Sequence, residues 1–172
     1  LPLTLDVSGD LDRLRFGLAS ETYGLRLGGD ISNPLQELSW NVEGGLEQLQ
    51  WPPVDEANAT TVSSLNVTSD GNIDDWSAAL ASNVQYGTLP NALLELTATG
   101  NAERMTVSEL RLVGEGTDVT ASGALAWSRD LEAKLAAVID RLDISPWLED
   151  WPAGQYLEGT MEVDWSASSV RV

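Results

Sequence analysis

The chain has 172 residues and a formal net charge of −18, from 27 acidic against 9 basic side chains, and it contains neither Cys nor His. So acidic a surface repels phosphate backbones and anionic membrane faces, and we expect no nucleic-acid partner. The missing residue types exclude thiolate nucleophiles, zinc sites built on Cys or His, and Ser-His triads. No apolar run approaches the ~20 residues of a membrane helix.

The first third of the chain alternates apolar and polar residues in short segments. This period of two predicts strands with one apolar face, over residues 1–7, 14–18, 23–27 and 38–42. Small residues predict a turn at Gly9, a turn or bulge at Gly28-Gly29, and a strand end at Gly44-Gly45. Residues 1–10 lack the charged segment and the cleavage site of a signal peptide, so we expect the chain to be part of a longer protein.

The same alternation returns after an interruption at 51–59. Pro52 and Pro53 predict a connection there, because proline cannot donate to a sheet ladder. Further strands are predicted over residues 65–67, 76–80, 84–86, 94–98, 105–107, 110–112, 119–127 and 161–165. A small turn is expected at Ser122-Gly123, within the segment 119–127.

The segment 131–139 is compatible with two structures. Its apolar residues also recur at helical spacing, and Ala136 and Ala137 favour a helix. Ser145-Pro146 resembles an N-cap followed by proline at the first helical position, which predicts one helical turn over 145–150.

Three stretches of the chain share one hairpin template. Each has two alternating apolar residues, a turn containing glycine, an acidic step and further alternation. They are residues 3–18, 65–80 and 94–109, with Gly9, Gly71 and Gly100 at the matching turn. Successive hairpins of this kind predict an extended meander, and two longer approximate repeats are expected over 1–54 and 90–160.

The candidate chemical sites are weak. Residues 70–75 begin like a calcium loop, but the sixth and twelfth positions hold Asp75 and Ala81 in place of Gly and Glu. The carboxylate pairs Asp74-Asp75 and Glu149-Asp150 are typical of solvated loops, and Asn58 and Asn66 begin glycosylation sequons. We therefore expect no metal, no cofactor and no enzymatic activity.

The aromatic residues are dominated by tryptophan: seven Trp, three Tyr and one Phe. Trp40, Trp76, Trp127 and Trp165 fall on predicted strands. Composition alone leaves two interpretations open, the core of a β-sandwich and a ligand groove.

A longer phrase of the sequence resembles a known family. The run GEGTDVTASGALAWSRDLEAKLAAVIDRLDISPWLEDWPAG (114–154) combines an alternating strand, a Trp-Ser-x-Asp step, and the phrases LD-x-SPWL and WPAG. A diverged copy, LRLGGDISNPLQELSWNVEGGLEQLQWP, occupies 25–52. Together they resemble the periodic unit of the TamB family, which is similar to AsmA-like and bridge-type lipid-transfer proteins.

The resemblance implies a fold and a setting. The fold would be all-β: an elongated antiparallel meander curled into an open groove, or half-pipe, with an apolar interior. On this basis we expect 131–139 to be a strand. The setting would be the periplasm, within a protein anchored in the inner membrane by a segment outside this chain. A TamA-like outer-membrane barrel would be the partner, contacted by other parts of the parent protein.

The resemblance also implies a role in moving phospholipid or assembling outer-membrane proteins. We expect one set of apolar residues to line the groove: Leu5, Leu14, Phe16, Leu25, Leu27, Leu38, Trp40, Leu65, Val67, Trp76, Leu94, Leu96, Val107, Leu112, Leu125, Leu131 and Val163. The first hypothesis is a conduit for phospholipid acyl chains in outer-membrane biogenesis. The second is a chaperone that holds strands of outer-membrane barrels or autotransporters for assembly and secretion. The third is a spacer or closed sandwich.

Overall fold

The computed structural model describes residues 3–52, 59–87, 90–128, 130–145, 148, 151–152 and 154–167. These residues form one antiparallel sheet in which eleven strands lie in chain order. The strands are β1 (Thr4–Gly9), β2 (Arg13–Ser20), β3 (Leu25–Ser32), β4 (Ser39–Trp51), β5 (Thr60–Asn72), β6 (Trp76–Tyr86), β7 (Ala92–Gly100), β8 (Arg104–Gly114), β9 (Thr117–Ala126), β10 (Leu131–Leu142) and β11 (Leu157–Ala167). A 3-10 turn, η1 (Glu21–Tyr23), joins β2 to β3.

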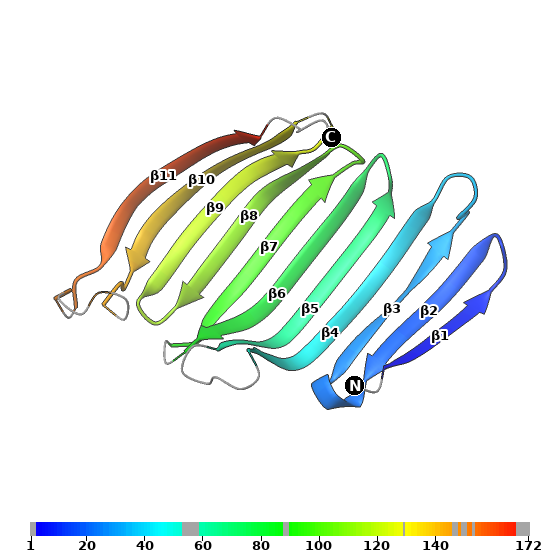
Figure 1. Cartoon of the computed structure of the whole chain (residues 1–172), viewed down its shortest axis with the longest axis horizontal. Coiled ribbons are helices and arrows are strands. Elements are labelled where there is room, and N and C mark those ends of the chain that lie inside the picture. The colour runs from blue at the N-terminus through cyan, green and yellow to red at the C-terminus, as the bar shows by residue number, and fades with distance from the viewer. Residues whose placement is uncertain are drawn as a thin grey trace.

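The sheet is open. β1 pairs only with β2 and β11 only with β10 in the described part of the chain, and the two outer strands do not meet. Figure 1 shows the strands bowed along their length, with neither a second sheet nor a covering helix over the described strands. The prediction of an open, all-β antiparallel meander is therefore confirmed. Because each pairing joins sequence neighbours, the sheet forms from hairpin contacts alone.

Three tight turns use the same chemistry, and all three predicted hairpins are confirmed. Asp10, Asn72 and Asn101 each follow the last glycine of a strand, and each side-chain oxygen accepts two backbone N–H groups within the turn. Gly9 and Gly71 have φ of 122° and 133°, a region that residues with a Cβ rarely occupy. The Gly-Asx pair thus specifies where each hairpin reverses.

Three glycine-containing pairs that were predicted as turns, a bulge or a strand end lie inside strands instead. Gly28-Gly29 lies within β3, Gly44-Gly45 within β4, and Ser122-Gly123 within β9. A Cβ at Gly29 would collide with the carbonyl oxygen of Asn41, and one at Gly44 with the Leu27 side chain. These glycines allow close approach of neighbouring strands, a role that the sequence pattern does not distinguish from a turn.

The ambiguous segment is a strand, as expected from the resemblance: 131–139 lies within β10. Residues 146–147 and 149–150 lie outside the described residues, so the helical turn predicted there is not described. The connection expected at 51–59 is confirmed where it is described, because β4 ends at Trp51 and β5 begins at Thr60.

The two sides of the sheet differ in composition. Directly paired residues of antiparallel strands project to the same side, so the pairing register assigns each residue to a face. One side, the apolar face, carries Leu5, Phe16, Leu27, Trp40, Val67, Leu80, Leu96, Leu110, Ala121, Ala137 and Met161 along successive strands. The other, the polar face, carries Asp6, Arg15, Asp30, Asn41, Thr68, Ala79, Thr97, Glu109, Thr120, Ala136 and Glu162.

Register shifts keep the apolar face continuous. Shifts occur after Ser63 of β5, between Val107 and Leu110 of β8, and after Ile139 of β10. Apolar residues on each side of these shifts are three positions apart, as in Val107 and Leu110, where strict alternation requires two or four. A bulge with one extra residue returns the second of them to the apolar face.

Candidate functional site

The predicted lining residues gather on the apolar face. All of them except Leu38 lie within strands, and the register places those on this one side of the sheet. Leu38 lies one residue before β4 and has no ladder partner among the described strands. The structure thus shows a shared face, and the binding of a ligand by these residues stays a prediction.

The apolar face is larger than the predicted set. Additional members include Leu18, Ile31, Val42, Val62, Met105, Val119, Leu135 and Ile139. Most follow the period of two, so the same signal would have identified them. The period of two does not identify Val62, because the β5 bulge lies between Val62 and Leu65. Its three-residue spacing from Leu65 is the signal that assigns it to the apolar face.

This face has no second layer in the described structure. Its central rows pack side by side: Leu96 is paired with Leu80 on β6 and with Leu110 on β8. Even so, no large side chain among the described residues is fully buried, and the apolar residues that are buried there are all alanines, Ala59, Ala98 and Ala137. Since soluble monomers rarely expose apolar patches beyond a few hundred Å², a face of this extent is typical of a binding surface.

Two tryptophans, Trp40 and Trp76, lie along one margin of the apolar face. Trp40, Gly71, Trp76 and Gly100 are consecutive partners across β4, β5, β6 and β7. The Trp76 ring occupies the space beside Gly100 that a Cβ would need. Trp40 Nε1 donates to Ser69 Oγ at 3.0 Å, which satisfies its one polar group.

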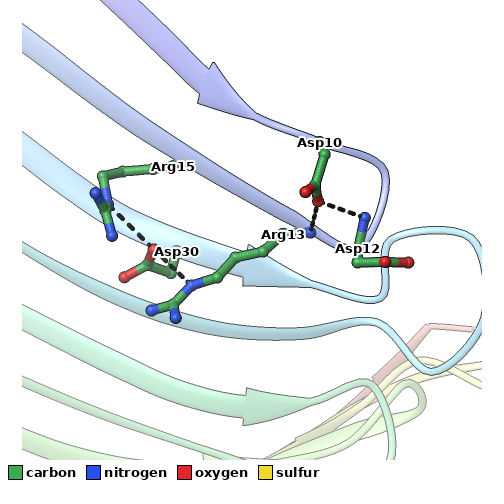
Figure 2. A network of polar contacts seen from close by, with 5 residues as sticks. All are labelled: Asp10, Asp12, Arg13, Arg15 and Asp30. Carbon is green, nitrogen blue, oxygen red and sulfur yellow. Dashed lines mark hydrogen bonds and ion pairs between the residues drawn. The ribbon is translucent and has the colours of Figure 1, made fainter.

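The polar face carries solvated charge. Figure 2 shows Asp30 on β3 between two arginines of β2: its Oδ1 lies 3.0 Å from Arg13 Nε and 3.4 Å from Arg15 Nε. The hydrogen bond from Arg13 lowers the pKa of the Asp30 carboxyl, and the same bond raises the pKa of Arg13. The arginine side chains are more than half exposed, so these ion pairs contribute little stability.

The larger depressions open on the polar face. One of about 800 Å³ lies over Gly17, Gly28 and Gly45, and one of about 620 Å³ lies over Ser122 and Ala136. Small side chains at these positions leave the backbone uncovered. Glu43, Glu47, Glu109 and Glu162 at their rims make both depressions wet and anionic.

The weak chemical candidates gain no support from the geometry. Asn72, in the calcium-like loop, uses its side-chain oxygen for the backbone N–H groups of Asp74 and Asp75. No group of three potential metal ligands occurs among the described residues. Asn66 donates from Nδ2 to the Ser64 carbonyl, while Asn58, Glu149 and Asp150 lie outside the described residues.

Comparison with known families identifies the chain. The family model described as TamB, N-terminal domain, matches residues 2–170. The chain belongs to the TamB family. Membership assigns it to the translocation and assembly module of the bacterial envelope. No curated protein and no solved structure matches this TamB chain. Among its described residues, no helix is long and apolar enough to span a membrane.

Proposed function

We propose that the apolar face shelters phospholipid acyl chains during transport between the inner and outer membranes, as a non-catalytic part of outer-membrane biogenesis. The observation that carries this proposal is one continuous apolar face, eleven strands long, with no covering layer in the described structure. In this proposal the segment lies in the periplasm, and other parts of the parent protein supply the inner-membrane anchor and contact a TamA-like barrel.

The composition of the face suits transport better than storage. Its rows in the described strands consist mainly of Leu, Val, Ile, Ala, Phe, Trp and Met, with a few small polar residues such as Ser69 and Ser82 and without a charged member, so an acyl chain meets no fixed charge as it moves. Each CH₂ buried there gains at most about 0.8 kcal/mol. The charged residues of the polar face keep the outside of the sheet hydrated.

Charges placed on the apolar face test the proposal. In Leu96→Asp and Leu125→Asp, we expect phospholipid recovered per mole of purified chain to fall about tenfold, because losing two CH₂ contacts costs that factor. Thr97→Asp is the matched control, since Thr97 adjoins Leu96 but projects from the polar face. Far-UV circular dichroism reports whether each variant keeps its strands. Equal lipid recovery from folded Leu96→Asp and Thr97→Asp would contradict the proposal.

The outer strands favour a second candidate, a chaperone for outer-membrane β-strands. Every residue of β1 is exposed, and β11 is exposed from Leu157 to Ser166. An exposed edge can pair with an extended chain, which would add a strand to the sheet.

Site-specific photocrosslinking in the parent protein separates the two candidates. A crosslinker at Leu96, in the middle of the apolar face, should capture lipid if the conduit proposal holds. A crosslinker at Glu162 on β11 should capture nascent barrel polypeptide if the chaperone proposal holds. Polypeptide captured at both positions, without lipid, would overturn the conduit proposal in favour of the chaperone.

A further inference from the structure

A cavity lies at the margin of the sheet where three connections meet. Tyr86 ends β6, Glu115 lies between β8 and β9, and Asp143 and Tyr156 belong to the connection from β10 to β11. These residues line a cavity of about 300 Å³, which is more enclosed than the two depressions on the polar face. Its apolar part includes Leu112, which is paired with Leu94 and Val119 on the apolar face. The cavity is therefore continuous with that face.

The polar part of the cavity is anionic and aromatic. Asp143 is held in place: its backbone N–H donates to the Gly116 carbonyl at 2.8 Å, and its Oδ1 accepts the Ser145 backbone N–H at 2.9 Å. Hydrogen bonds from the Ser145 side chain and backbone lower the pKa of Asp143, so it is ionised at neutral pH. Two carboxylates beside two tyrosine rings form an environment suited to an organic cation.

One of the cavity's tyrosine rings already contacts a cation that is not part of the cavity lining. The Arg141 guanidinium lies over the Tyr156 ring, 5.5 Å from its centroid. Arg141 projects from the polar face of β10, since its ladder partner is Asp118. Because Arg141 projects to the other side of the sheet, the charged groups that line the cavity are Glu115 and Asp143, and a purely anionic headgroup there would face both carboxylates.

From this arrangement we propose that the cavity binds the ammonium of an amine-headgroup phospholipid whose acyl chains lie on the apolar face. The inference rests on the proposed function, and it adds a headgroup preference and a place for the headgroup. Glu115 and Asp143 pair with the ammonium, the tyrosine rings flank it, and Leu112 adjoins the start of the acyl region.

Competition between two headgroups tests the inference. The chain is incubated with vesicles of equal phosphatidylethanolamine and phosphatidylglycerol with identical acyl chains, re-isolated, and its bound lipids are quantified by mass spectrometry. In Glu115→Gln/Asp143→Asn we expect the enrichment of phosphatidylethanolamine to fall about threefold, the scale of partly exposed charge pairs. The control Glu95→Gln/Glu109→Gln removes the same charge from the polar face and should keep the enrichment.

The outcomes separate the two proposals. If wild type binds neither lipid, the proposed function fails and this inference fails with it. If wild type binds both lipids but the cavity and control variants show equal enrichment, the headgroup inference alone is overturned, because net charge then explains the preference. A final competition experiment uses glycerophosphoethanolamine, which lacks acyl chains. If this compound displaces lipid at equal concentration, the cavity binds free amines, and the assignment of a lipid as its ligand is overturned.

Discussion

Strands β7 and β11 have the same alternating pattern but very different burial. On β7, Leu94 and Leu96 are half-buried and Ala98 is only 1% exposed. On β11, Met161, Val163 and Trp165 are each between 43% and 48% exposed, although they project to the same face. The difference follows from neighbours: β7 lies between β6 and β8, while β11 pairs only with β10.

The comparison shows where stability comes from in a single-layer sheet. In a sandwich or barrel, an apolar side chain is covered from above by a second layer. In the described part of this chain, cover comes from side chains on adjacent strands, so burial falls at the outer strands whatever their sequence. A small central side chain such as Ala98, which has Ala78 and Val107 as its ladder partners, is almost fully buried because it does not project beyond its neighbours.

Introducing a charge should show the largest difference in stability between β7 and β11. In Ala98→Asp we expect the free energy of unfolding to fall by roughly 2–4 kcal/mol, because an unpaired carboxylate replaces a buried methyl group. In Val163→Asp, at the exposed edge, the loss should stay below ~1 kcal/mol. Urea unfolding followed by tryptophan fluorescence measures both.

The control for this pair is Thr99→Asp, which adds the same charge on the polar face of β7. It should resemble Val163→Asp. Equal destabilisation by Ala98→Asp and Val163→Asp would mean that the edge is covered in solution, for example by a second copy of the chain.

Substitution of two strand glycines should give a smaller difference in stability between a central strand and a strand near the edge. A Cβ at Gly100 of β7 would collide with the Trp76 ring, whereas a Cβ at Gly17 of β2 would meet nothing within 4 Å. Gly100→Ala should therefore cost about 1–3 kcal/mol through overpacking. Gly17→Ala should stabilise the chain by ~0.5 kcal/mol, because the unfolded state loses freedom. Urea midpoints shifted in the same direction by both variants would contradict this account.

Much of this architecture was predictable from local pattern. Period-two alternation identified most strands, and glycine followed by Asp or Asn identified three hairpin turns, because these signals depend on a few adjacent residues. The choice of strand for 131–139 needed the family resemblance, since Ala136 and Ala137 made a helix equally acceptable to the local pattern.

The remaining features depend on contacts between strands. Gly29 and Gly44 resemble turn residues in sequence, and only the register shows that they permit close packing within strands. The cavity at the loop margin combines Tyr86, Glu115 and Asp143 from three connections, which no local pattern brings together. Leu38 was assigned to the lining because it alternates with Trp40 and Val42, and the structure begins β4 one residue later, at Ser39.

The smallest expected effect is a difference in pH dependence between the β1–β2 turn at the edge of the sheet and the β7–β8 turn near its centre. Asp10 Oδ1 accepts the N–H groups of Arg13 and Asp12 at 2.9 and 3.0 Å in the β1–β2 turn, as Asn101 does for Arg104 and Glu103 in the β7–β8 turn. The bond from Arg13, then that from Asp12, lowers the pKa of Asp10, so its folded pKa lies below the unfolded value. The stabilisation is therefore present above the unfolded pKa and lost as pH falls through the folded pKa.

Backbone amide shifts of the two hairpins measure this difference. Between about pH 6 and about pH 2, the Arg13 amide should titrate below the ordinary carboxyl range, while the Arg104 amide should change little because Asn101 stays neutral. Asp10→Asn should make the Arg13 profile resemble that of Arg104. If the Arg13 amide keeps its titration in that variant, Asp10 is not its source, and the two turns hold equally well in acid.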